Sequence, residues 1–177
     1  MLGALRAAEK MVEDLPEQTE QATAPGTLSR RVFIVHGHDE KAKGQLEVLL
    51  TEFGLEPVVL HRQADEGKTI IEKFEKHSDV GYAFILLTPD DIAFSATQEK
   101  LSDAERRYEY RARPNVIFEF GYFVGRLGRG NVCCLHTGNV TLPSDVQGVI
   151  YKSFASNIEE VAYAVSKELK ARGYQLK

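Results

Sequence analysis

From residue 31 onward, short apolar runs alternate with longer segments whose apolar residues recur at helical spacing. The short runs are rich in β-branched residues, which is typical of buried strands. The longer segments repeat their apolar residues every three or four positions, which is typical of amphipathic helices. We expect strands at 31–37, 56–61, 81–91, 131–138 and 149–154, and helices at 39–54, 68–78, 114–127 and 157–173.

Strands that alternate with helices predict an α/β fold, a parallel sheet with helices on both faces. Five strands in about 145 residues fit the flavodoxin-like strand order 2-1-3-4-5. The run at 149–154 is expected at an edge of the sheet, and the polar residues 92–112 fit neither pattern. We expect the domain to occupy residues 30–177, with a short amphipathic helix and a Pro-containing linker at 1–29 outside it.

Charge and hydropathy exclude several classes of function. The formal net charge of −4 argues against general nucleic-acid binding, which usually needs a basic surface. No apolar run reaches the roughly 18–20 residues that cross a bilayer, and the charged N-terminus is unlike a secretory signal. The only cysteines, Cys133 and Cys134, are adjacent in an expected strand, which favours reduced core residues. We therefore expect a cytoplasmic protein that binds neither membranes nor nucleic acid.

Ligands of such sheets bind outside the carboxyl ends of the strands. The loops after the first three expected strands are therefore candidates for a site. Two of them also have ordinary structural interpretations, since Asp39 fits a helix N-cap and 88–91 fits a turn. The chemistry-bearing residues of these loops are Gly37, His38 and Asp39 after the first strand, His61, Arg62, Gln63 and Asp65 after the second, and Thr88, Asp90 and Asp91 after the third.

Familiar nucleotide and metal motifs are absent from these loops. The EGKTI segment resembles the end of a P-loop, but the glycine required five positions before Gly67 is replaced by Arg62. No G-x-G-x-x-G follows the first strand. His36, His38 and Asp39 have no further ligand at helpful spacing, so we expect no metal site.

The expected helix at 114–127 is apolar around most of its circumference. Its polar residues share one narrow face: Asn115, Glu119, Tyr122 and Arg126. This face is either the exposed edge of the helix or places Glu119 in a cleft, where aromatic neighbours hold its carboxylate in a low dielectric. Gly121 and Gly125 allow another backbone or a ligand to approach closely.

Four sequence blocks occur in the order VFIVHGHDE, GKTIIEKFE, ILLTPDD and RARPNVIFEFGYFVGRLGR, and LPSDVQG follows them. Together they resemble the TIR domain of bacterial antiphage effectors of the CBASS and Pycsar type. The resemblance covers residues 31–172, and it implies a flavodoxin-like fold.

Many such domains hydrolyse NAD+ between nicotinamide and ribose, with NAD+ as substrate and no cofactor. The resemblance assigns the catalytic glutamate to Glu119, where a carboxylate would stabilise an oxocarbenium-like ribose. Phe33 is a further candidate for stacking on a substrate ring. The resemblance implies substrate contacts at Gly37, His38, Asp39, Thr88, Asp90, Asp91, Arg113, Asn115, Tyr122 and Phe123.

The resemblance also implies activation by self-association through TIR–TIR contacts. The loop at 61–67, with His61, Arg62, Gln63 and Asp65, would contact a neighbouring copy. A sensor domain or partner chain that responds to a cyclic nucleotide would drive assembly. Two alternatives stay open: a non-enzymatic TIR module that signals by self-association, and a nucleoside deoxyribosyltransferase-like enzyme.

Overall fold

The structure, a computed structural model, describes residues 28–59, 72, 79–144, 146 and 148–177. Most of the expected N-terminal segment at 1–29 lies outside these residues. The same holds for the loop at 61–67 and for the expected helix at 68–78, of which Glu72 alone is described.

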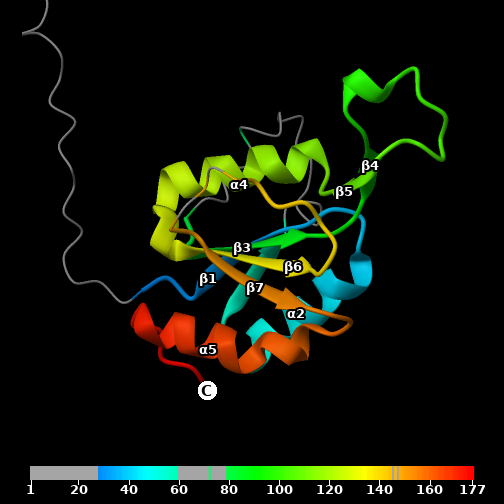
Figure 1. The fold of residues 1–177 in the computed structure, drawn as a ribbon. Helices are drawn as coiled ribbons and strands as arrows, with labels where there is room; N and C mark the ends of the chain where they lie inside the picture. Colours follow the sequence, from blue (N-terminus) through cyan, green and yellow to red (C-terminus); the bar gives the residue numbers. More distant parts are fainter. Residues whose placement is uncertain (1–27, 60–71, 73–78, 145, 147) are drawn as a thin grey trace, which may run out of the picture.

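A parallel sheet of five strands forms the centre of the domain, in the order β2-β1-β3-β6-β7 (Figure 1). In chain order this is the flavodoxin-like sequence 2-1-3-4-5, so the predicted topology is confirmed. The run at 149–154 forms an edge strand, as expected. The strands are β1 (Arg31–Val35), β2 (Glu56–Val59), β3 (Tyr82–Leu87), β6 (Val132–Thr137) and β7 (Ile150–Phe154).

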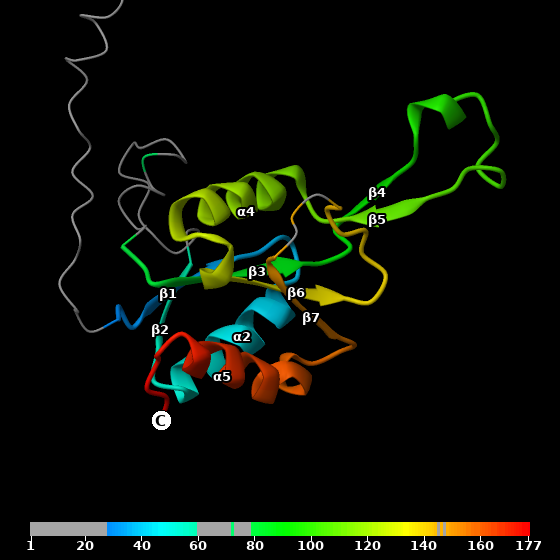
Figure 2. The same ribbon diagram turned by 60° about the vertical axis from the view of Figure 1, so that its left-hand side comes forward.

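Helices cover both faces of the sheet. One face carries α2 (Glu40–Glu52) and α5 (Ala162–Ala171), and the other carries α4 (Pro114–Leu127) (Figures 1 and 2). Pro114 suits the first turn of α4 because its missing N–H has no partner there in any case, and Gly128 ends the helix at φ 77°. A single 3-10 turn, η3 (Arg129–Asn131), then leads into β6.

The C-terminal helix is shorter than the sequence predicts. The expected helix at 157–173 is divided into a 3-10 turn, η4 (Ile158–Val161), and α5. Asn157 caps the turn, and the Glu160 side chain accepts backbone hydrogen bonds in return, which forms a capping box. This local bonding fixes the first turn before the α-helical pattern begins.

Each face of the sheet has its own apolar core. The core beneath α2 and α5 includes Leu46, Tyr82 and Leu169, and the core beneath α4 includes Phe33, Phe120 and other buried side chains. All six residues of β3 are buried, because the strand is central and covered on both faces. In the register of β1 and β3, Val35 pairs with Ile85, so β3 continues beyond the end of β1 to Leu87.

Residues 91–111 form an arm that projects from the body, and all but the first of them belong to the segment 92–112 that the sequence leaves unassigned (Figure 2). The arm consists of β4 (Asp91–Ala93), a 3-10 turn η2 (Ala96–Gln98) and β5 (Glu109–Arg111), with β4 and β5 antiparallel. The expected strand at 81–91 therefore ends at Leu87, and Asp91 begins the arm. No described helix has the length and hydropathy to cross a membrane.

Candidate functional site

Glu119 lies in the first half of α4, on the flank of the face that packs on the sheet. Val116, Phe120 and Phe123 fill that face and are at most 2% exposed. The helix begins at the edge of the sheet where β3 leads into the arm, which is the carboxyl edge expected to hold a ligand (Figure 1). Glu119 lies in the second turn of this helix, which is anchored in the core.

Burial controls the ionisation of Glu119. Removal from water raises the pKa of its carboxyl from 4.5 to about 7, while the positive charge of Arg113 acts in the opposite direction. A carboxyl with this pKa gains and loses its proton near neutral pH, which is common at functional sites. The partial burial of Glu119 argues against a fully exposed edge for the polar face of α4, and its place in a cleft stays a prediction.

The four polar residues of α4 differ in their exposure to solvent. Asn115 and Arg126 are exposed, whereas Glu119 and Tyr122 are half-buried. The ring of Tyr122 meets that of Phe123 edge-on, with centroids 5.3 Å apart. A ligand that contacts Asn115 or Arg126 would therefore stay in water, whereas one that contacts Glu119 or Tyr122 would be partly removed from it.

Phe33 and Phe123 are fully buried and lie against each other, with ring centroids 4.5 Å apart. Their faces are occupied by the core beneath α4. This burial disfavours the predicted contact of either ring with substrate. Both rings instead belong to the core on which α4 packs. Tyr122 is the half-buried aromatic ring of α4.

The loops after β1 and β3 are joined by Asp90. Its Oδ1 accepts a hydrogen bond from the His38 backbone N–H at 3.0 Å and from the Thr88 hydroxyl at 3.1 Å. Its Oδ2 is buried with no hydrogen-bond partner among the described residues. The absence of a side chain at Gly37 allows this arrangement, because a Cβ there would lie 1.8 Å from Oδ2.

Asp39 acts as a helix cap. Its Oδ1 accepts from the Ala42 backbone N–H at 2.8 Å, which confirms the structural interpretation of this residue. Its predicted contact with substrate stays a prediction. His36 is buried, with its Nδ1 2.8 Å from the Gly37 carbonyl oxygen, and His38 is exposed at the loop surface.

The structure therefore brings together one part of the predicted site at the ends of β1 and β3, namely Gly37, His38, Thr88 and Asp90. A second part lies on α4 and its cap, with Arg113 close enough to Glu119 to act on its pKa. Asp91 sits at the base of the arm opposite Arg111. The sequence predicts Asp90 as a site residue but not its role in joining two loops. The glycine at position 37 leaves room for the Asp90 carboxylate, but a glycine in a sequence does not say which side chain fills that space.

Metal-binding geometry is not found in the described part of the chain. Among those residues, no group of three or more His, Cys, Asp or Glu side chains is placed to hold an ion. Cys133 and Cys134 are fully buried free thiols, as predicted.

The chain is a TIR domain: a TIR family model matches most of it, and the five-stranded parallel sheet of order 2-1-3-4-5 agrees with that class. More narrowly, the chain belongs to the family of CAP12/Pycsar effector protein TIR domains, whose family model matches residues 31–156. The description of this family is that of an effector protein.

Individual relatives agree with this family. The uncharacterized protein YuaY of Escherichia coli (strain K12) is 41% identical over 145 residues, which are 77% of this chain and 46% of YuaY. Protein tirC of Dictyostelium discoideum is 36% identical over 138 residues, 74% of this chain and 67% of tirC. CD-NTase-associated protein 12 of Flavobacterium daejeonense is 36% identical over 63 residues, 36% of this chain and 20% of that protein. The chain thus spans less than half the length of YuaY.

Proposed function

We propose that this chain is an NAD+ glycohydrolase that cleaves the nicotinamide–ribose bond and that Glu119 is its catalytic residue. The observation that carries the proposal is the half-buried Glu119 carboxyl, with a pKa near neutrality, on the helix at the carboxyl edge of a TIR sheet. The family match supports an effector role, and the chemistry is our inference from the site.

The reaction needs no general acid, because the leaving nicotinamide does not have to be protonated. The bond between C1′ of the ribose and the nicotinamide nitrogen breaks, and its electron pair leaves with nicotinamide, which becomes neutral. The ribose acquires oxocarbenium character, and water adds to C1′ and loses a proton. An ionised Glu119 would accept hydrogen bonds from ribose hydroxyls and stabilise the developing positive charge.

Other residues would bind the substrate around this carboxylate. Arg113 and Asn115, at the first turn of α4, would hold phosphate or ribose oxygens. Tyr122 is the half-buried ring available for stacking on a base. The Gly37–His38 backbone, held by Asp90, would form the opposite wall.

We further propose that the activity serves antiphage defence in the cytoplasm and is switched on by self-association. A separate domain or chain that senses a cyclic nucleotide would bring copies together. The greater length of YuaY, of which this chain matches 46%, leaves room in such a relative for a further domain. The loop at 61–67, which lies outside the described residues, stays our candidate for TIR–TIR contact.

The test is NAD+ consumption by the purified chain at high and at crowded concentration, with nicotinamide release followed by chromatography. We expect turnover by the wild type and none by Glu119→Gln, which keeps the shape of the side chain without its charge. Glu52→Gln, at the exposed end of α2, is the matched control and should behave as wild type.

Three outcomes separate the alternatives. Equal NAD+ turnover by Glu119→Gln would remove the catalytic assignment. Cleavage of deoxynucleosides with no action on NAD+ would support the deoxyribosyltransferase-like alternative. Self-association with no turnover of either substrate, even in crowded protein, would support the non-enzymatic signalling module.

A further inference from the structure

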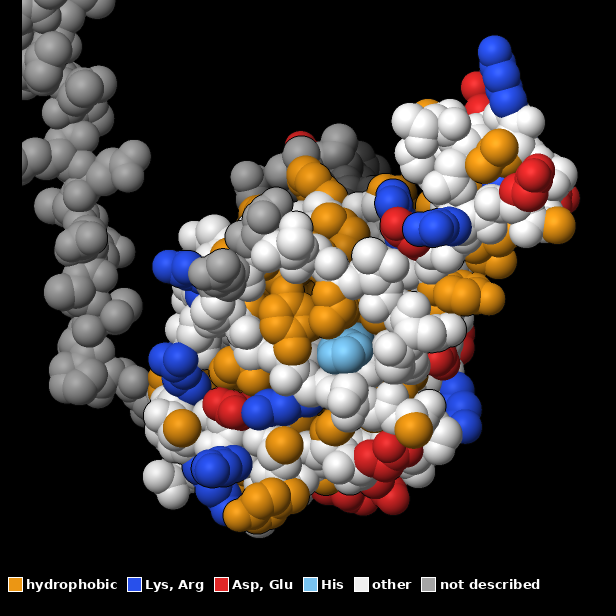
Figure 3. All heavy atoms as spheres, viewed as in Figure 1, with side chains coloured by type: hydrophobic (Ala, Val, Ile, Leu, Met, Phe, Trp, Pro, Cys, Tyr) orange, Lys and Arg blue, Asp and Glu red, His pale blue; other side chains and the backbone are white. Residues whose placement is uncertain are grey.

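The amino edge of the sheet, opposite the carboxyl edge, carries a group of positive charges. Both α4 and α5 end at this edge, and β1 begins there (Figure 1). Figure 3 shows Lys and Arg side chains along its left-hand side, over the turn after α4 and the end of α5. We call this group the basic edge, and its members, all exposed, are Arg30, Arg129, Lys170 and Arg172.

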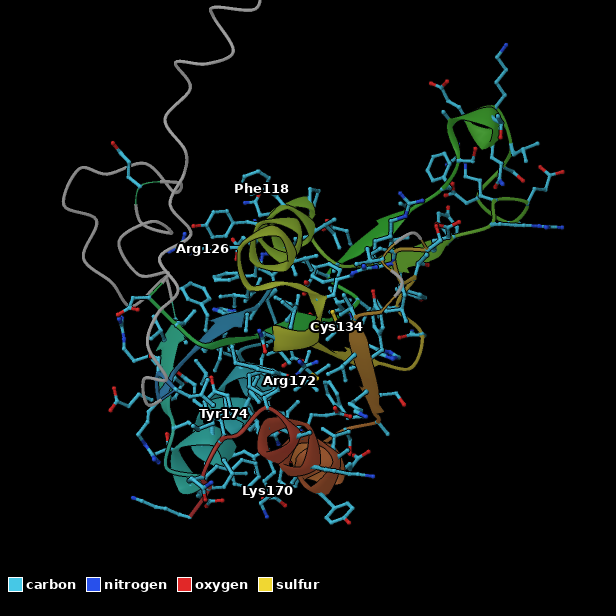
Figure 4. The ribbon with its side chains drawn as sticks, turned by 90° about the vertical axis from the view of Figure 1, so that its left-hand side faces the viewer. Phe118, Arg126, Cys134, Lys170, Arg172 and Tyr174 are labelled. Atoms are coloured by element: carbon cyan, nitrogen blue, oxygen red, sulfur yellow. The ribbon has the colours of Figure 1, made fainter. Side chains whose placement is uncertain are left out.

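Packing contacts place the charges of two elements close together. The Arg172 guanidinium covers Gly130, where a Cβ would collide with it. Arg172 therefore lies against η3, the turn that also carries Arg129. Figure 4 looks onto this edge and shows Arg172 on the side of α5 that faces the sheet and Lys170 on the opposite side. The positive charges thus extend from the end of α5 to the turn after α4.

The charge of the basic edge has little compensation within the described part of the chain. None of the described Asp and Glu side chains forms an ion pair with Arg30, Lys170 or Arg172. Lys152 on the neighbouring β7, in contrast, pairs with Glu168 at 2.8 Å. The negative ends of α4 and α5 offset part of the charge, but each carries only about half an elementary charge. A positive potential therefore remains at this edge and favours an anionic partner.

The sequence before Leu28 contains an acidic segment. Residues 13–20 lie outside the described part of the chain, and they carry four carboxylates, those of Glu13, Asp14, Glu17 and Glu20. No Lys or Arg occurs in residues 11–29. Leu28 is the first described residue, and its Cδ1 lies 3.2 Å from the Cβ position of Gly173, which follows Arg172. The described part of the chain thus begins beside the basic edge, a few residues after the acidic segment.

We propose that the acidic segment 13–20 docks on the basic edge of the same chain and is held there by opposite charges. Glu20 precedes Leu28 by eight positions, and an extended chain of that length spans roughly 28 Å at most, about the diameter of a small domain. The segment can therefore reach every member of the basic edge. Docking would keep residues 1–12 at the amino edge, away from the loops after β1 and β3. The contact involves neither Glu119 nor those loops, so it does not rest on the proposed reaction.

The short covalent connection favours this segment over other anionic partners. A surface ion pair is weak on its own, so a contact made of a few such pairs needs a high local concentration. A short connection supplies an effective concentration on the order of millimolar, well above that of most free partners. Nucleic acid fits less well, because the formal net charge of −4 opposes the approach of a polyanion.

Paramagnetic relaxation enhancement in the full chain tests the contact. A nitroxide attached to Gln18→Cys lies within the acidic segment, and labelling at this thiol is selective because Cys133 and Cys134 are buried. At low ionic strength the label should broaden the amide signals of 129–131 and 170–173 several-fold more than those of 97–107 in the arm. Raising the ionic strength from about 0.1 M to about 1 M shortens the Debye length from about 10 Å to about 3 Å and should remove most of this broadening.

Charge reversal at the basic edge should weaken the contact. The double variant Lys170→Glu, Arg172→Glu should reduce the broadening at 129–131 about threefold or more, because two of the four cations are replaced by anions. The double variant Lys100→Glu, Arg107→Glu, at exposed positions of the arm, is the matched control and should leave the broadening unchanged. Thermal unfolding of each variant checks that it is folded.

A variant of the acidic segment gives a second test that leaves the described part of the molecule intact. The double variant Glu17→Gln, Glu20→Gln removes two of the four carboxylates, so it should also reduce the broadening about threefold or more. This variant tests the contact even if charge reversal at the end of α5 prevents folding.

Three results would overturn the proposal. The first is the absence of selective broadening at 129–131 and 170–173 at low ionic strength. The second is broadening that survives both high ionic strength and the loss of charge in either double variant, because the contact would then not be electrostatic. The third is broadening of equal strength when spin-labelled chains are mixed with separate isotope-labelled chains, because the segment would then dock on another copy.

Discussion

The carboxylate of Asp90 fills the space beside Gly37 in which any other residue would place its Cβ. That Cβ would lie 1.8 Å from Oδ2 and 2.6 Å from Cγ of Asp90. The same carboxylate accepts the His38 backbone N–H at 3.0 Å. One side chain thus joins the loop after β1 to the loop after β3, at the edge of the sheet where the proposed substrate binds.

Replacement of Gly37 by alanine should expel Asp90 from this position. We expect Gly37→Ala to lower the free energy of unfolding by about 1–3 kcal/mol, measured by urea denaturation. In the double variant with Asp90→Ala the clash is gone, because the clashing atoms belong to the carboxylate. The two effects should therefore be clearly non-additive. Strictly additive effects would show that the two residues do not interact.

Glu119 should make stability depend on pH. Its pKa is raised by burial from 4.5 to about 7, so the folded state holds a proton that the unfolded state releases. This contribution is fully present below pH 4.5 and is lost as the pH rises through 7. Glu119→Gln has no charge to bury, and above pH 7 it should be more stable than wild type by on the order of 1–3 kcal/mol. Near pH 4.5 the difference should nearly vanish in urea denaturation, and a constant difference would contradict the burial of this charge.

Arg113 should set the pH range in which Glu119 is ionised. Its positive charge lowers the pKa of the carboxyl against the effect of burial, so Arg113→Gln should raise that pKa further. Arg113→Lys keeps the charge and should restore the wild-type value in large part. Side-chain carboxyl NMR titration measures this directly. If NAD+ turnover depends on ionised Glu119, the rising limb of its pH profile should move to higher pH in Arg113→Gln alone.

The arm should depend on Arg106 for its order. The Arg106 guanidinium lies 4.5 Å from the ring centre of Phe94 and donates to the carbonyl oxygens of Gln98 and Glu99. Arg106→Ala removes these contacts at once, so limited proteolysis should cut within 94–108 much faster than in wild type. The melting temperature of the body should change little, because the arm stands outside both cores. Arg107→Ala is the matched control, and equal cleavage of the two variants would exclude this role.

The sheet and its main helices were predictable because each has a local signal. The β-branched runs fix the five strands, and Pro114 and Gly128 mark the two ends of α4 at the predicted residues. Leu46 and Leu169 lie in the core on the faces that their spacing indicates. Periodicity succeeds in these elements because one face of each packs on the sheet.

Features that depend on distant contacts were not predictable. The arm is held by contacts such as the T-shaped packing of Phe94 on Tyr108, between residues that follow no regular period. The sequence overestimates the extent of β3, which ends at Leu87; Thr88 beyond it is as buried as the strand, so burial does not mark where the strand ends. Spacing places Glu119 on a flank of α4, but the depth of its burial depends on what other elements pack around the helix.

The two adjacent cysteines give the domain an internal reporter of unfolding. Cys133 and Cys134 are fully buried at the centre of the sheet, and burial raises the pKa of the Cys133 thiol to about 12. A thiolate is the reactive form, so neither thiol reacts quickly while the sheet is closed. The rate of thiol labelling in the untouched sequence therefore measures how often the whole domain opens, and it needs neither substrate nor an engineered probe.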